Sequence, residues 1–235
     1  MKSFKFLSLP VLLLSTGIFF SSCKKDSAGT PTCKIITVSA SAGDGYNFTY
    51  NSDGKIETVT YGATLTVYTY SGNTTVASTT NNGAFAGKKT ITLNANGFAA
   101  SVKSETSANG STWYKDTYEY NGAELLKDTY TNSQNVAPQV TTAAWSGGNM
   151  ISTTQSGTTT TIEYDLTKPA REGDYIWLIQ TIQGYKVYST KNPIKSVATG
   201  NSITSFDYTF ENGKITALKF NGGSITTYSY QYQCK

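Results

Sequence analysis

Hydrophobic and polar residues alternate along most of the chain, and turn-forming residues interrupt the alternation at short intervals. One pattern, an apolar residue, any residue, an aromatic residue and then a turn, recurs in FTYNSDGKI (48–56), YEYNGAEL (118–125) and YTFENGKI (208–215). Successive side chains of a strand point to opposite faces, so period-two alternation around a turn predicts a β-hairpin. The chain is therefore expected to consist of antiparallel hairpins.

The pattern occurs about nine times with a period of about 22 residues, which is the length of two strands and two short turns. The other copies are YTYSGN (68–73), ITLNANGF (91–98), AAWSGGNMI (143–151), IEYDL (162–166), KVYSTKNPIKSV (186–197) and YSYQYQC (228–234). Thr49, Thr69 and Glu119 stand between the apolar positions, which indicates a polar outer face and an aromatic inner face. We predict an all-β fold, an antiparallel up-and-down meander of about 16 or more strands that forms a strongly curved sheet or barrel.

The phrase Gly-Lys-Ile occurs after two of the turns, at residues 54–56 and 213–215. In both copies apolar residues follow the Ile by three and five positions, which shifts the strict alternation by one residue. A shift of this kind is typical of a β-bulge, and we expect one beside each of these turns.

One segment, KPAREGDYIWLIQTIQGY (168–185), departs from the strand rhythm. Pro169 suits a helix start, and Tyr175, Ile176 and Ile179 share one helical face. We predict a short helix near residues 171–183 that plugs one end of the barrel. Trp177 is expected to belong to this plug, with an exposed contact as the alternative.

The first residues have the layout of a lipoprotein signal peptide, residues 1–22. Lys2 and Lys5 precede an apolar run at 6–20, which is too short for a comfortable membrane span, and small residues lead to Cys23. Cys23 is the expected lipidation site, with an ordinary secretory signal and a chance cysteine as the alternative. Residues 23–32 would be a lipidated flexible tether, and residues 33–235 a single repetitive β-hairpin domain.

The two remaining cysteines, Cys33 and Cys234, lie at opposite ends of this domain. An exported protein meets an oxidising compartment, so we expect a structural disulfide that joins the two ends. A reactive thiol pair or a metal site is the alternative, although the sequence offers no further ligand nearby.

The Y-x-Y-N-x-x-G-K-I phrase resembles the YD or Rhs-type repeats. Together with the FSSC ending of the signal (20–23), which resembles a lipobox, Lys-Asn-Pro-Ile (191–194) and the closing Tyr-x-Tyr-x-Tyr, it makes the chain similar to Bacteroidota-type lipoproteins of unknown function with a porin-like β fold. The resemblance implies a lipid-anchored protein of the cell envelope, at the outer membrane and either periplasmic or surface-exposed. The resemblance implies no catalytic or binding residues, because none is established for these lipoproteins. Ser27 matches the short O-glycosylation motif of such bacteria, and a chance match is the alternative.

The outer column of Thr, Ser and Glu differs from the apolar band of a membrane porin, so we expect a soluble barrel held by its lipid. The 19 basic and 15 acidic residues nearly balance, which does not indicate nucleic acid binding.

Catalytic motifs are scarce in this chain. It contains no histidine, which excludes Ser-His-Asp and Cys-His catalysis and His-bearing zinc sites. Glu119 and Glu163 could form a glycosidase pair only if their hairpins were neighbours, and solvated surface charge is the preferred interpretation. We predict no enzymatic activity, no cofactor and no metal site.

Aromatic residues are the remaining candidates for binding: the chain has 17 Tyr, 10 Phe and 3 Trp. Trp113, Tyr114, Trp145 and Trp177 are candidate ligand-binding aromatics, with plain packing as the alternative for each. Three non-enzymatic functions stay open: a protein-binding or structural module, a glycan-binding accessory for polysaccharide capture, and a carrier of a lipophilic ligand. An exposed aromatic patch would favour the second, and an interior mouth lined by Phe and Ile the third.

Overall fold

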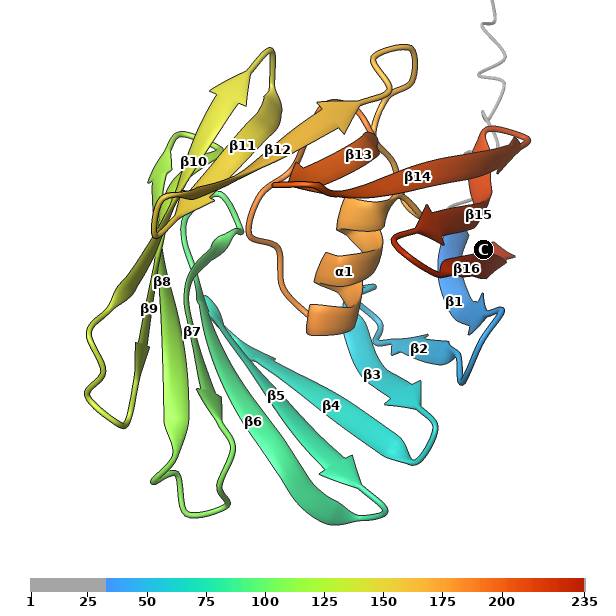
Figure 1. Ribbon diagram of the computed structural model, residues 1–235. Helices are drawn as coiled ribbons and strands as arrows, with labels where there is room; N and C mark the ends of the chain where they lie inside the picture. Colours follow the sequence, from blue (N-terminus) through green and yellow to red (C-terminus); the bar gives the residue numbers. More distant parts are fainter. Residues whose placement is uncertain (1–32, 235) are drawn as a thin grey trace, which may run out of the picture. The chain divides into compact units, whose positions relative to one another are not determined.

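The structure, a computed structural model, describes residues 33–234 as sixteen strands and one helix (Figure 1). The strands are β1 (Cys33–Ala40), β2 (Tyr46–Tyr50), β3 (Ile56–Tyr61), β4 (Thr64–Ser71), β5 (Thr74–Asn81), β6 (Ala84–Leu93), β7 (Ala99–Glu105), β8 (Trp113–Asn121), β9 (Glu124–Asn132), β10 (Gln139–Ser146), β11 (Asn149–Gln155), β12 (Thr158–Tyr164), β13 (Ile194–Thr199), β14 (Ser202–Glu211), β15 (Lys214–Asn221) and β16 (Ile225–Cys234). The helix, α1, spans Tyr175–Gln183. The predicted all-β meander is confirmed.

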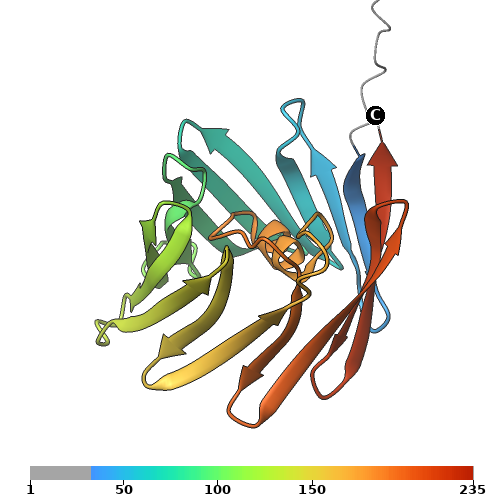
Figure 2. The same cartoon turned by 90° about the horizontal axis from the view of Figure 1, so that it is seen from above.

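The sheet closes into a barrel. Every strand pairs antiparallel with its neighbours in chain order, and β1 pairs with β16, so the strands form the ring seen in Figure 2. The seam begins where Cys33 faces Cys234 in the ladder and runs to Ala40 opposite Tyr228. Closure leaves no free sheet edge, which removes the main aggregation hazard of a long meander.

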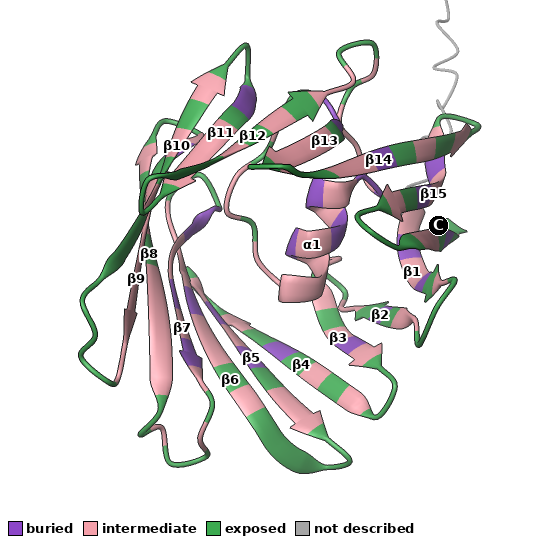
Figure 3. Cartoon of the chain, viewed as in Figure 1, coloured by how far each residue is buried: buried purple, intermediate pink, exposed green. Residues whose placement is uncertain are grey.

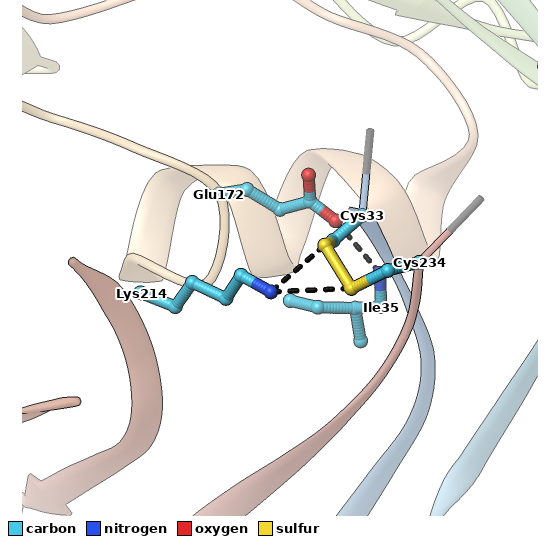
Figure 4. The surroundings of a disulfide bond; sticks show 5 residues. All are labelled: Cys33, Ile35, Glu172, Lys214 and Cys234. Carbon is cyan, nitrogen blue, oxygen red and sulfur yellow. Dashed lines mark hydrogen bonds between the residues drawn. A yellow bond between two sulfur atoms is a disulfide. The ribbon is translucent and has the colours of Figure 1, made fainter. Parts of the chain in front are cut away.

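A disulfide joins β1 to β16 at the start of the seam, as the cysteine positions predicted. Cys33 and Cys234 are bonded with an S–S distance of 2.03 Å, and Figure 4 shows their surroundings. Lys214 directs its Nζ at both sulfurs, 2.8 Å from Cys33 Sγ and 3.3 Å from Cys234 Sγ. Glu172 accepts a hydrogen bond from the Ile35 N–H at 2.8 Å, which ties the segment before α1 to β1.

The two faces of the barrel differ as the alternation predicted. Phe48 and Tyr68 are buried inside, whereas Thr49 and Thr69 between the apolar positions are exposed. Figure 3 shows the same alternation along many strands. Hydroxyl pairs occur on the outer face, for example Thr49 and Thr58 with their Oγ1 atoms 2.8 Å apart. Exposed apolar residues such as Leu65 and Val67 of β4 interrupt this face.

The helix α1 starts later than expected because Asp174 caps it. The Asp174 side chain accepts a hydrogen bond from the Trp177 N–H at 2.9 Å and another from the Arg171 N–H at 3.0 Å. An aspartate in this role ends the preceding turn and starts the helix at the next residue, so residues 171–174 form the cap and not the first helical turn. The helix ends at Gly184, which adopts φ +82°.

The helix lies inside the ring of strands and packs against its wall (Figure 2). Tyr175 contacts Phe206 of β14 with ring centroids 4.3 Å apart, and Trp177 meets Phe48 and Tyr230 at 6.5 and 6.4 Å. A Cβ atom at Gly184 would lie 2.1 Å from the Tyr68 ring, so glycine is required there by space as well as by conformation. The predicted plug is therefore part of the core.

Seven aromatic side chains join neighbouring hairpins by one repeated contact, which we call the aromatic clasp. In each, a Tyr hydroxyl or Trp N–H on one strand donates to a backbone carbonyl of the preceding strand at 2.6 to 2.7 Å. The pairs are Tyr50 with Ile35, Tyr70 with Ile56, Tyr120 with Ala99, Trp145 with Leu125, Tyr164 with Met150, Tyr208 with Ile194 and Tyr232 with Ile215.

Every accepting residue lies at a β-bulge, where the ladder is locally disrupted and a carbonyl needs another partner. Ile56, for example, faces Tyr50 directly after the register shift of the β2–β3 hairpin, and Ile215 occupies the same position in the β14–β15 hairpin. The bulges expected beside the two Gly-Lys-Ile turns are confirmed.

Both residues of the repeated Lys-Ile phrase contact the tyrosine of one clasp. The Ile carbonyl accepts the Tyr hydroxyl, and the Lys before it lies over the ring of the same Tyr. Lys55 Nζ is 5.0 Å from the centroid of the Tyr70 ring, and Lys214 Nζ is 5.1 Å from that of Tyr232. The phrase is therefore explained by contacts with the next hairpin and not by its own turn.

The role of the bulge is supported by one position of the inward column where the side chain has no hydrogen-bond donor. Leu93 stands where most other hairpins carry Tyr or Trp, and it follows the β4–β5 hairpin. That hairpin pairs without a bulge from Thr64 opposite Asn81 to Ser71 opposite Thr74. An unbroken ladder satisfies its own carbonyls, so an apolar residue suffices at Leu93.

We expect Tyr70→Phe to lower the free energy of unfolding by about 1–2 kcal/mol, because the Ile56 carbonyl loses its donor inside the barrel. Tyr61→Phe is the matched control, since the Tyr61 side chain is 42% exposed. Urea unfolding of both variants measures the difference, and equal losses would contradict the clasp.

We expect Cys234→Ser to lower the free energy of unfolding by about 5 kcal/mol, the chain-entropy value for a loop of this length, since the bonded cysteines are 201 residues apart. Guanidinium unfolding of the oxidised protein, its reduced form and the variant gives this value. A reduced protein as stable as the oxidised one would refute a stabilising role.

Candidate functional site

A cavity of about 270 Å³ lies between α1 and the barrel wall. Strands β2, β15 and β16 form the wall, and the helix contributes its apolar face. The lining residues are Tyr46, Tyr175, Leu178, Ile179, Ile182, Gln183, Phe220 and Tyr228. Most of these side chains are apolar or aromatic, which is the usual lining of a small-molecule site. We call this space the helix cavity.

Three phenol groups give the helix cavity its polar side. Burial raises the pKa of Tyr46, and the neighbouring Tyr228 and Tyr61 add to the effect. Burial likewise raises the pKa of Tyr175, again with a contribution from Tyr228. The Tyr46 and Tyr175 hydroxyls therefore stay protonated at neutral pH and can donate or accept hydrogen bonds. The cavity suits a neutral lipophilic molecule with one polar group.

Ionisable side chains form a second cluster on the inner face of β6, β8 and β9, which we call the lumen cluster. It consists of Lys89, Asp116, Tyr118, Asp128 and Tyr185. Asp116 and Asp128 lie diagonally across the β8–β9 ladder, since Asp116 faces Tyr130 and Asp128 faces Tyr118. Tyr185 follows α1, so the plug covers this part of the wall.

The charged members of the lumen cluster shift one another's pKa values. Burial is the main cause that raises the pKa of Asp128 to about 6, and the Asp116 charge adds to it. Burial also raises the pKa of Asp116, which the Lys89 charge opposes. Burial lowers the pKa of Lys89, and its ammonium lies 5.6 Å from the Tyr185 ring centroid. Shifts of this kind are common at functional sites.

The four aromatic candidates from the sequence do not form one patch. Trp145 points inward, donates its Nε1–H to the Leu125 carbonyl at 2.7 Å and meets Tyr188 edge-on at 6.0 Å. Trp177 packs between Phe48 and Tyr230. Both side chains thus contribute to packing.

The adjacent residues Trp113 and Tyr114 point to opposite faces of β8. Lys103 Nζ lies 5.6 Å from the Trp113 ring centroid. Tyr114 stacks on Tyr130 with centroids 6.0 Å apart and an interplanar angle of 27°, beside the lumen cluster. Of the four, Tyr114 alone joins a candidate site on the described residues.

The acidic pair considered from the sequence is separated in space. Glu119 forms an ion pair with Lys127 at 2.5 Å on β8 and β9, whereas Glu163 on β12 accepts a hydrogen bond from Ser196 at 3.1 Å. Both are surface charges with local partners, as the preferred interpretation stated.

Two candidate sites, Cys23 and Ser27, lie outside residues 33–234. Within the described range, no three Asp, Glu, Cys or His side chains are placed to hold a metal ion. No helix of the described part is long and apolar enough to cross a bilayer.

The sequence reasoning missed the lumen cluster, although one signal was present. In WYKDTYEYN, Asp116 is in phase with Tyr114, Tyr118 and Tyr120, so it belongs to the inward column and not to the solvated one. A carboxylate in an aromatic inner column is unusual because its burial is costly. That Lys89 and Tyr185 accompany it follows only from the closed barrel and the plug.

Comparison with known proteins finds likeness in structure alone. No protein-family model and no curated protein matches the chain. A porin-like protein from Bacteroides uniformis ATCC 8492 matches with a TM-score of 0.59 and 15% identity, over 85% of this chain and 96% of that one. A porin-like protein from Bacteroides vulgatus ATCC 8482 matches with a TM-score of 0.58 and 13% identity, over 84% and 97%. At these identities the likeness establishes the shared barrel fold.

We expect the free energy of unfolding to fall as pH rises from about 4 to 6, because the Asp128 carboxyl binds its proton more tightly in the folded than in the unfolded state. Asp128→Asn should remove up to about 2 kcal/mol of this fall. Asp53→Asn, in an exposed turn, is the control. Urea titrations at pH 4, 6 and 8 measure the effect, and identical pH profiles for wild type and Asp128→Asn would disprove it.

Proposed function

We propose that the protein is a non-enzymatic lipoprotein of the cell envelope that carries a small lipophilic molecule inside its plugged barrel. The helix cavity is the observation that carries this proposal. It is a partly open space between the helix and the barrel wall, lined by Ile179, Ile182 and Phe220. This apolar lining favours a lipophilic carrier over the other two functions considered from the sequence.

The geometry of the cavity supports a ligand of limited size. About 270 Å³ lies near the lower end of the range for small-molecule sites. Leu178 and Phe220 offer apolar contact, and Tyr46 or Tyr228 can bond one oxygen of the ligand. A fused-ring alcohol, a short fatty alcohol or a similar neutral molecule meets these requirements.

The placement in the cell envelope rests on the signal layout and Cys23, with support from the polar outer face of the barrel. A barrel whose outer hydroxyls bond one another, as Thr154 and Thr159 do at 3.0 Å, is suited to water and needs a lipid to stay at a membrane. Anchoring at the outer membrane, on either side, is the arrangement we propose.

A glycan-binding role is the second candidate. The stacked pair Tyr114 and Tyr130 supports it, because aromatic faces bind the C–H faces of sugars while carboxylates accept hydrogen bonds from hydroxyls. The pair lies on the inner wall, so a glycan would enter the barrel instead of lying on an exposed patch.

We expect Ile182→Trp to abolish saturable binding of 1-aminoanthracene, a small apolar fluorescent probe, because the larger side chain fills the helix cavity. Ile203→Trp, at a side chain that is 66% exposed, should bind like the wild type. Mass spectrometry of organic extracts should recover a lipophilic molecule from wild type but not from Ile182→Trp. If the wild type binds no apolar probe, the carrier function is wrong, and a protein-binding or structural role becomes the better account.

We expect Cys23→Ser to release the protein from the membrane fraction, because acyl chains on Cys23 are its proposed anchor. Metabolic labelling with an alkynyl fatty acid should mark the wild type and not the variant. Ser27→Ala is the control for a change in the same segment. Membrane association that survives Cys23→Ser would rule out the anchor.

A further inference from the structure

The lumen cluster contains an acidic group that the described residues leave without a counterion. Lys89 is its cation, and the charges of Lys89 and Asp116 each counter the effect of burial on the pKa of the other. No salt bridge involves Asp128 among the described residues, and the charge identified as acting on it is that of Asp116, which repels it. With two carboxylates and one ammonium, the cluster carries a net negative charge in a partly desolvated place.

Asp128 also has an unused hydrogen-bond acceptor. Its Oδ1 atom is buried and has no hydrogen-bond partner in the described structure. Leaving a buried acceptor unpaired is costly, and a charged one more so. A donor from outside the chain would remove this cost, and a positively charged donor would also neutralise the cluster.

Aromatic rings surround the two carboxylates. Asp116 faces Tyr130 and Asp128 faces Tyr118 across the β8–β9 ladder. Tyr130 stacks on Tyr114, and Tyr118 and Tyr185 lie close enough for each to shift the pKa of the other. Ring faces attract cations, most of all where water is excluded. Carboxylates and aromatic faces together are the lining that organic ammonium groups prefer.

A metal ion fits this cluster less well. Divalent cations such as calcium take six or more oxygen ligands, several from carboxylates. Two aspartates stand here, and no group of three metal-ligating side chains occurs in residues 33–234.

We propose that the lumen cluster binds an organic ammonium group, with Asp128 as its counterion and the Tyr114–Tyr130 pair as an aromatic wall. The ammonium can belong to an amino sugar or to an aliphatic amine, since both present the same charge and donors. The Lys89 charge offsets that of Asp116, so one further ammonium balances the cluster. This site uses β6, β8 and β9, whereas the helix cavity uses β2, β15 and β16, and it does not depend on the carrier function.

Isothermal titration at pH 7.5 with glucosamine, cadaverine and glucose tests the proposal. Glucosamine and cadaverine represent the two sources of an ammonium, and glucose is the neutral match of glucosamine. We expect saturable binding of at least one ammonium compound and at least about tenfold weaker binding of glucose. Ile182→Trp should leave ammonium binding unchanged, which separates this site from the helix cavity.

Charge variants then give two opposite effects. Asp128→Asn, which keeps the size of the side chain, should weaken ammonium binding by at least about tenfold, whereas Lys89→Met should strengthen it by about the same factor, because it removes the competing cation. Asp207→Asn, outside the cluster, is the control. Near-ultraviolet circular dichroism confirms that each variant is folded.

Opposite effects of Asp128→Asn and Lys89→Met support the site even if one variant proves less stable, because a purely structural role of Asp128 would not make the lysine variant bind more tightly. Three results overturn the proposal: no saturable binding of either ammonium compound, glucose binding as tightly as glucosamine, or unchanged binding in a folded Asp128→Asn protein.

Discussion

The width of a sixteen-stranded barrel is the constraint on which the rest of this structure depends. Side chains from the wall fill the interior of about eight strands, but a ring of sixteen is too wide for them. This chain fills its lumen in two ways. Large aromatic residues stand in the inward columns, and the segment between β12 and β13 turns into the ring, where Leu178 is only 2% exposed. A fully buried leucine contributes roughly 1.5–3 kcal/mol.

The aromatic clasps join this filling to the closure of the sheet. A bulge bends most of the hairpins so that the ring of strands can curve, and it leaves a carbonyl to be satisfied. A Tyr or Trp from the next hairpin supplies the donor and at the same time fills lumen space. Tyr120 extends the arrangement, since its hydroxyl bonds both Ala99 of the wall and Val187 of the plug. Curvature, filling and hydrogen bonding are thus met by the same side chains.

Uneven filling produces both candidate sites. Tyr175 and Trp177 draw α1 toward β2, β14 and β16, and the helix cavity remains where the helix face and the wall do not meet. Along β8 and β9 the inward column changes from aromatic to acidic, and Asp116 and Asp128 face the interior there. In a barrel wide enough to enclose a plug, part of the inner wall is not covered by the plug. Ligand sites can occupy that part of the wall without weakening the β1–β16 seam.

Period-two alternation was enough to predict the hairpins, the inward aromatic column and the bulges, because these depend on local geometry. Cys33 and Cys234 indicated that the termini meet, and Pro169 with the apolar face of 175–182 indicated the helix. The helix α1 begins four residues after the start of the predicted range, because Asp174 caps it.

The sites depend on contacts between distant segments, which alternation does not specify. Trp145 and Trp113 look alike in the sequence, yet one clasps Leu125 inside the barrel and the other lies under Lys103. The alternation along each strand shows which of the two tryptophans points inward only once the inner face of the barrel is known. The meeting of Lys89, Asp116 and Tyr185 requires the register of β6 to β8 and the path of the plug together.

The central claim is that the plug is part of the barrel core, and hydrogen exchange of the α1 amides tests it most directly. Mass-spectrometric exchange can follow residues 175–183 beside the β1–β16 seam in one experiment. If the plug is part of the core, the amides of α1 and of the seam exchange slowly and lose protection together when the protein unfolds globally. Rapid exchange of α1 while the seam stays protected would contradict it, because the barrel would then be stable without its plug.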